Sequence, residues 1–177
     1  KISLLASRNA PYRKKKHPYW KKYFHLGEGY NYLLPHLLGA VGRAQIERFS
    51  KDMLIRKKNI GNFYKKVFRS KDYFLTQKRI KNSSPVFWLN SLFFKNLSKN
   101  EVIKLAHLLE KKGIEIRSGF WPMSELKGFK SIYIKDKEKV SKELFEKTLV
   151  LPSNVNLKYK DIIKFKKEIE KNIPKNK

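Results

Sequence analysis

The segment Gly29-Tyr30-Asn31-Tyr32 combines residue types that can contact a phosphate group: a glycine, an amide side chain and two tyrosine rings. The amide of Asn31 can donate a hydrogen bond to a phosphate oxygen without adding another charge. An asparagine in a tight turn can equally bond its own backbone, which is the simpler interpretation. The segment therefore predicts either a loop that contacts phosphate or a self-contained turn.

A second group of candidate residues begins at Arg117 and continues through Phe120, Trp121 and Pro122. A guanidinium group can pair with phosphate oxygens at two points, and adjacent aromatic rings with a proline can shape an apolar wall beside it. In the alternative interpretation, both aromatic side chains belong to the hydrophobic core. The segment therefore either forms the rim of a ligand site or belongs to the core.

The remaining motifs indicate neither a metal centre nor a nucleophilic triad. The four histidines, at positions 17, 25, 36 and 107, lack metal-ligand spacing. No phosphate-binding glycine loop, paired-histidine motif or nucleophile elbow is present. We therefore predict no metal site, and these motifs single out no catalytic residue in this chain. His25 lies just before Gly29, and it is either an aromatic loop residue or a group that lines a ligand pocket.

The formal charge of +27 over 177 residues predicts attraction to polyanions such as nucleic acid. The basic residues are spread along the chain, so a solvated lysine-rich surface is the alternative. A basic nucleic-acid-binding domain is therefore the rival function, although no nucleic-acid-binding motif supports it. The chain has no cysteine, which favours the cytoplasm, and no apolar run or signal peptide that would insert it into a membrane.

The spacing of apolar residues predicts a long helical segment from residue 36 and a compact α/β unit after residue 84. Within the helix, Gly61 is expected to cause a bend or break, because glycine costs about 1 kcal/mol relative to alanine there. Residues 70–84 are polar and basic and predict a linker. The expected buried face of the helix consists of Ile60, Phe63, Tyr64, Val67 and Phe68.

In the second half we expect alternating strands and helices that form an α+β layer with a small, partly antiparallel sheet. Strands are predicted at 86–94, 114–116 and 131–134. Ser98 and Glu101 form a capping box at the start of a helix, and Gly113 is placed for its C-cap. Two further helices are predicted, one marked by Val140, Leu144 and Phe145 and one by Tyr159, Ile162, Ile163 and Ile169.

Three segments in the same order resemble the DegT/DnrJ/EryC1/StrS family of pyridoxal-phosphate-dependent nucleotide-sugar aminotransferases. The first contains Gly29-Tyr30-Asn31-Tyr32 and the helix entry Gly39-Ala40-Val41-Gly42, and the second is Gly113 to Met123. The third, Leu149 to Ser153 and the helix after it, resembles the end of these enzymes, and Ser153 is either architectural or faces the pocket. Together the segments cover about residues 20–172.

The resemblance implies roles for individual residues. Asn31 would bind the phosphate of pyridoxal 5'-phosphate in the neighbouring subunit of a homodimer. Two positions depart from the family pattern: Leu33 replaces a cationic residue, and Ser124 replaces a histidine. The residues implied to contact the substrate are His25, Tyr30, Tyr32, Arg117 and Trp121.

The resemblance also implies the fold and the function. The chain would be the C-terminal part of a fold type I transferase, and the lysine that binds the cofactor covalently would lie upstream. The full enzyme would transfer an amino group, with glutamate as the donor, to a keto-sugar linked to a nucleoside diphosphate. Residues 1–35 would then end the large cofactor-binding domain, residues 36–80 would form a connecting helical segment, and residues 81–177 would form the small α+β domain.

Overall fold

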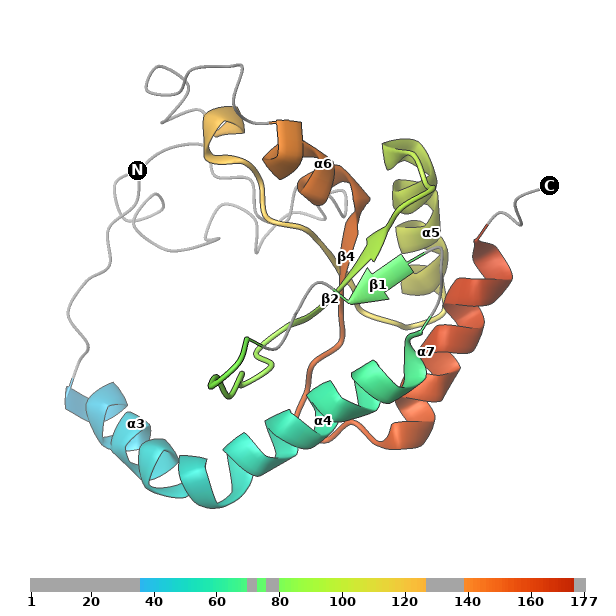
Figure 1. Cartoon of the computed structure of the whole chain (residues 1–177). Helices are drawn as coiled ribbons and strands as arrows, with labels where there is room; N and C mark the ends of the chain where they lie inside the picture. Colours follow the sequence, from blue (N-terminus) through green and yellow to red (C-terminus); the bar gives the residue numbers. More distant parts are fainter. Residues whose placement is uncertain (1–35, 70–72, 76–79, 127–138, 174–177) are drawn as a thin grey trace.

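A computed structural model describes residues 36–69, 73–75, 80–126 and 139–173, and the structural statements below concern these residues. Its centre is a four-stranded sheet with the strand order β1-β2-β4-β3, and every pairing in it is antiparallel. Helix α4 runs along the lower side of the molecule in Figure 1, where it lies beside α7, and α7 also contacts α5. The strands are β1 (Tyr73–Leu75), β2 (Asn90–Phe94), β3 (Arg117–Ser118) and β4 (Thr148–Leu151).

The mixed α/β fold that the sequence predicts is confirmed. The long helical segment consists of α3 (His36–Arg48), a π-helical turn (Phe49–Met53) and α4 (Leu54–Val67). The other helices are α5 (Lys99–Lys111), a 3-10 turn (Met123–Glu125), α6 (Lys139–Lys147) and α7 (Tyr159–Asn172).

One face of the sheet and the inner faces of α4, α5 and α7 form the hydrophobic core. All four residues of β4 are buried, and Leu92 of β2 stands opposite Leu149 of β4. The predicted inner face of α4 is confirmed, since four of its five residues are buried and Phe63 packs against the core from a half-buried position. The largest fully buried side chains are Tyr64, Tyr73, Phe94, Ile60, Leu92, Leu105, Leu109, Ile116, Leu149, Leu151, Ile162 and Ile169.

The predicted bend at Gly61 is wrong. Helix α4 continues through Gly61, and the irregular turn lies earlier, in the π-helical segment Phe49–Met53. Gly61 is buried, and a Cβ built on it would overlap the ring of Phe87. The glycine therefore makes room for a packed ring and does not interrupt the helix.

Three strand and linker predictions also need correction. The predicted linker contains β1, because Tyr73 is buried and its hydroxyl donates a hydrogen bond of 2.6 Å to Glu170. The strand predicted at 86–94 begins only at Asn90, since Phe87 has a positive φ that an extended strand does not allow. The strand predicted at 114–116 is displaced to Arg117–Ser118. The strand predicted at 131–134 lies outside the described residues.

The predictions for the other helices are confirmed, with one difference in α6. Helix α7 buries Ile162 and Ile169 and ends before Pro174, as expected. In α6, Phe145 is buried but Val140 and Leu144 are exposed. The division into segments 1–35, 36–80 and 81–177 stays a prediction. No described helix is long and apolar enough to cross a membrane.

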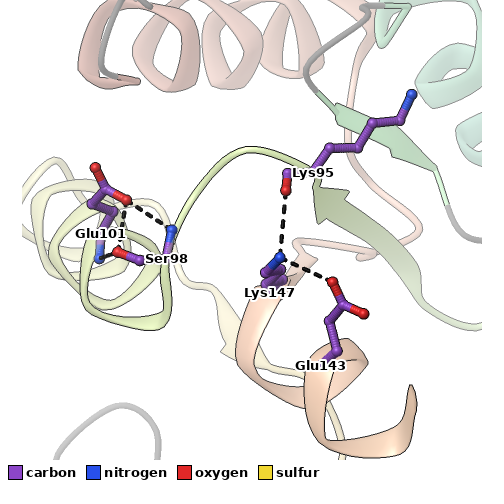
Figure 2. Close-up of polar contacts among 5 residues, drawn as sticks. All are labelled: Lys95, Ser98, Glu101, Glu143 and Lys147. Atoms are coloured by element: carbon purple, nitrogen blue, oxygen red, sulfur yellow. Dashed lines mark hydrogen bonds and ion pairs between the residues drawn. The ribbon is translucent and has the colours of Figure 1, made fainter. Parts of the chain in front are cut away.

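Both ends of α5 have the caps that the sequence predicts. The hydroxyl and backbone N–H of Ser98 donate to the Glu101 carboxylate at 2.6 and 2.7 Å, as Figure 2 shows. These hydrogen bonds lower the pKa of Glu101, the side-chain bond contributing most. At the other end, Gly113 has φ +74°, and the N–H of Ile114 donates to the carbonyl of Leu109 at 3.0 Å.

Figure 2 also shows the hydrogen bonds of Lys147, at the end of α6. The ammonium of Lys147 donates to the Glu143 carboxylate at 2.9 Å and to the carbonyl of Lys95 at 3.4 Å. Lys95 directly follows β2, so the lysine joins the last turn of α6 to the chain between β2 and α5. The caps and this contact fix the helices that precede and follow β3.

Gly61→Ala should destabilise the fold although alanine is the better helix former. The gain of about 1 kcal/mol in helix propensity is opposed by the overlap with Phe87, and overpacking costs about 1–3 kcal/mol. We expect a net loss in the free energy of unfolding, measured by urea denaturation. Asn62→Ala is the matched control, because this exposed neighbour gains propensity without a clash. A Gly61→Ala protein more stable than wild type would contradict the packing described above.

Ser98→Ala should cost about 1 kcal/mol in the free energy of unfolding, because it removes the N-cap of α5. The contribution of Glu101 should depend on pH. Its pKa is lower in the folded than in the unfolded chain, so this contribution is present above the unfolded pKa and is lost as pH falls through the folded value. Denaturation of wild type and Glu101→Gln at neutral and acidic pH should therefore give curves that converge at acidic pH. An undiminished difference there would show that the carboxylate does not act as a cap.

Candidate functional site

The predicted site residues divide into two sets. His25, Tyr30, Asn31 and Tyr32 lie outside the described residues, so their roles stay predictions. Arg117 and the segment that follows it are described, at the β3 edge of the sheet.

Arg117 lies on the face of the sheet that is turned away from the helical core. It stands opposite Val150 of β4, and residues directly opposite in an antiparallel pair share a face. The neighbouring Leu149 belongs to the core cluster, whereas Val150 is buried outside it. The guanidinium of Arg117 is half exposed and donates to the carboxylate of Glu115 at 3.3 Å. The strand therefore presents a cation at an accessible edge, with one exposed carboxylate beside it.

The two aromatic residues after β3 have different environments. Trp121 is half-buried, and its ring centroid lies 4.4 Å from that of Phe145 in α6. Phe120 is 58% exposed. The core interpretation therefore describes Trp121 better than Phe120, although a half-buried indole still has surface that a ligand can contact. Arg117 and Trp121 belong to the same short segment of chain. The guanidinium of Arg117 contacts Glu115, and the ring of Trp121 contacts that of Phe145.

Gly119 allows this segment to lie against α6. Its N–H donates to the carbonyl of Thr148 at 3.1 Å. A Cβ at this position would come within 3.1 Å of the Phe145 Cα and 3.2 Å of the Leu144 carbonyl oxygen, both of which are backbone atoms. The close approach therefore fixes where the chain leaves β3 and, with it, the position of Trp121.

A small cavity lies beneath β3, between α5, α6 and β4. It is lined in part by Ser118, Thr148 and the Lys99–Glu146 ion pair, whose atoms lie 3.0 Å apart. The hydroxyl of Ser118 is buried there without a hydrogen-bond partner. With a volume of about 10 Å³, the cavity has room for about one water molecule and none for a nucleotide. The cavity is therefore not the substrate site.

A polar network that the sequence did not predict joins α4 to the ends of β2 and β4. We call it the junction network, and it consists of Lys57, Tyr64, Asn90 and the turn Pro152–Ser153. The ammonium of Lys57 donates to the carbonyls of Ser153 at 2.5 Å and of Trp88 at 3.4 Å. The hydroxyl of Tyr64 donates to the carbonyl of Pro152 at 2.6 Å.

Burial changes the proton affinity of two members of the junction network. It lowers the pKa of Lys57 and raises that of Tyr64, because the charged form of each loses solvation. Both groups nevertheless donate to carbonyl oxygens, which satisfies their N–H and O–H groups in part. The ammonium of Lys57 is therefore engaged in hydrogen bonds to two backbone carbonyls and is poorly placed to act as a free amine.

The side chain of Ser153 serves the junction network. Its hydroxyl accepts hydrogen bonds from the backbone and side-chain N–H groups of Asn90, both at 3.1 Å, and donates to the carbonyl of Leu151 at 3.1 Å. These contacts support the architectural alternative for Ser153. Its position after a buried strand and a proline was the available signal. Lys57 gave none, because it is one of 42 lysines and arginines.

The described residues contain no group of three or more histidines, cysteines, aspartates or glutamates that could hold a metal ion.

Comparison with known proteins agrees with this fold. The family model of the DegT/DnrJ/EryC1/StrS aminotransferases matches residues 6–170. GDP-perosamine synthase of Escherichia coli O157:H7 is 28% identical over 143 residues, which are 81% of this chain and 37% of that protein. The chain thus spans well under half of the length of this relative.

Two solved structures show the same partial coverage. The apo form of Spr1654, a putative sugar aminotransferase from Streptococcus pneumoniae, gives a TM-score of 0.71 at 19% identity over 97% of this chain and 42% of its own. PseC of Helicobacter pylori, an aminotransferase involved in the biosynthesis of pseudoaminic acid, gives 0.67 at 16% identity over 82% and 39%. At these identities the structures show the shared fold. Because the family model covers all but the two ends of the sequence, the chain belongs to the DegT/DnrJ/EryC1/StrS aminotransferase family.

Proposed function

We propose that this chain is the C-terminal part of a pyridoxal-phosphate-dependent aminotransferase that acts on a keto-sugar linked to a nucleoside diphosphate, with glutamate as the amino donor. The match of the family model to residues 6–170 carries this proposal. The partial coverage of the relatives supports a chain that is one part of a longer enzyme, and its C-terminal place in that enzyme is inferred from the resemblance of its motifs. The rival function, nucleic-acid binding, has no support from the comparisons.

Pyridoxal phosphate supplies the electron sink for transamination when it is bound. In this proposal, the amide of Asn31 donates a hydrogen bond to the phosphate of the cofactor in the neighbouring subunit of a homodimer. The covalent link to the cofactor is assigned to a lysine upstream of this chain. The contacts of Lys57 fit that assignment, because its ammonium is held by the carbonyls of Ser153 and Trp88.

Arg117 is assigned to an anionic group of the substrate. Its half-exposed guanidinium at the sheet edge has the geometry to bind a phosphate at two points, and the Glu115 carboxylate would be displaced on binding. His25, Tyr30, Tyr32 and Trp121 complete the proposed substrate contacts. Leu33 and Ser124 depart from the cationic residue and the histidine of the family pattern. A cytoplasmic location is part of the same proposal.

The function is tested by assay of the intact protein with pyridoxal phosphate, glutamate and nucleoside-diphosphate keto-sugars. The expected result is transfer of the glutamate amino group to the sugar, which mass spectrometry of the sugar product detects. Binding of duplex DNA that survives near-physiological salt, with no amino transfer, would favour the rival function.

Arg117→Ala should raise the KM for the nucleotide sugar much more than it lowers kcat. A hydrogen bond to a charged group is worth about 1.5–3 kcal/mol, which corresponds to about a ten- to hundredfold loss. Arg117→Lys should recover only part of it, because an ammonium lacks the two-point geometry. Arg69→Ala, at an exposed position after α4, is the control and should leave KM unchanged. An unchanged KM in Arg117→Ala would remove this residue from the site.

Asn31→Ala should weaken retention of pyridoxal phosphate in the intact protein by about ten- to hundredfold, since it removes a hydrogen bond to a charged acceptor. Equilibrium dialysis of the cofactor measures the change. Asn59→Ala, at an exposed position of α4, is the control and should retain the cofactor normally. Equal cofactor affinities of Asn31→Ala and wild type would refute the assignment.

A further inference from the structure

The turn before β2 holds a large side chain in a conformation that few residues adopt. Phe87 has φ +53°, in the left-handed region that favours glycine. Such a conformation persists only where the surrounding structure enforces it, and it is common at ligand-binding sites. Here the enforcement is visible, because the buried ring of Phe87 packs against Gly61, where a Cβ would overlap it. The ammonium of Lys65 lies 4.7 Å from the centroid of the same ring.

Contacts anchor the chain before and after Trp88, and one of them holds the carbonyl of Trp88 itself. Phe87 is anchored on α4, and Asn90 is bonded to the Ser153 hydroxyl through its backbone and its side chain. The carbonyl of Trp88 itself accepts a hydrogen bond from Lys57. The indole has a different environment, since Trp88 is 70% exposed. A rigid backbone therefore holds the largest side chain type in an exposed position.

The turn buries the ring of Phe87, but the exposed indole of Trp88 adds little hydrophobic burial of its own. The left-handed turn also adds strain that a smaller residue or an extended backbone would avoid. Local stability therefore does not explain why the turn presents a tryptophan. A binding function does explain it, because a backbone that is already held in place leaves only the side-chain torsions to be ordered when a ligand contacts the ring.

We propose that Trp88 is a ligand-contact residue whose indole stacks on a flat ring face of the nucleotide-sugar substrate. This inference rests on the proposed function. The recognised chemistry is a planar or weakly polar ring face, which either the nucleobase or the sugar can supply. Phe87, Gly61 and Lys57 act as positioning residues that hold the turn.

The test is calorimetric titration of the intact protein with four probes: GDP, UDP, GDP-mannose and UDP-glucose. Trp88→Ala should weaken the binding of at least one probe about tenfold, in line with the loss of one stacked ring. Trp88→Phe should keep most of the affinity, because a ring remains. A loss that is equal for a free diphosphate and its sugar conjugate identifies the base as the stacked ring. A loss confined to the conjugates identifies the sugar.

Ile80→Ala is the matched control, because Ile80 is an apolar residue of the same connection and is similarly exposed. It should bind all four probes as wild type does, and the melting temperatures of all variants should agree. Wild-type affinity in Trp88→Ala would overturn the inference and leave the proposed function intact. An equal loss in Trp88→Phe and Trp88→Ala would overturn ring stacking. If wild type binds none of the four probes, the proposed function and this inference both fail.

Discussion

The arrangement of the described residues depends on how α4 is attached to the turn that follows β4. The hydroxyl of Tyr64 and the ammonium of Lys57 hold two successive carbonyls in the turn that follows β4, and Asn90 holds the serine side chain of the same turn. These donors lie at the boundary of the core, where a buried carbonyl without a partner is costly. The network therefore fixes the angle at which the helical segment leaves the sheet.

The large positive charge is accommodated in ways that need few carboxylates. Lys65 and Lys66 lie over aromatic rings, at 4.7 Å from the Phe87 centroid and 5.6 Å from that of Tyr159. Lys57 donates to the backbone carbonyls of Ser153 and Trp88. Each contact uses the partial negative charge of a ring or a carbonyl instead of a full anion. The fold can therefore carry an excess of lysine without a matching number of acidic residues.

Local signals predicted the helices of this fold better than its strands. The capping box at Ser98 and the glycine at 113 were visible because each cap uses residues close together in sequence. β1 was not visible, because three residues between basic flanks become a strand only by pairing with β2. The role of Gly61 was misread for the same reason. Phe87, the ring that requires this glycine, is distant in sequence and near only in the fold.

The site shows the same division between local and long-range information. Arg117 was predicted from the resemblance of its segment to the family and from its own chemistry, and the structure places it at an accessible edge. Nothing in the sequence singled out Lys57 of the junction network or Trp88, the residue that we propose as a ligand contact, because an exposed tryptophan and one lysine among many acquire meaning only from the backbone around them. Motif resemblance identified the segments that relatives share. It gave no information on the contacts of Gly61 and Lys57 that hold the turn before β2.

The π-helical turn Phe49–Met53 sets the rotational phase between α3 and α4. A π turn closes its hydrogen bonds one residue later than an α turn, so it accommodates one residue more than the regular helix. Successive residues of an α-helix are rotated by about 100°. If the same residues formed a regular α-helix instead, the exposed apolar side chains of α3, such as Leu37 and Ile46, would be rotated by about that angle relative to the core. The wider turn thus determines the direction in which α3 presents its apolar surface.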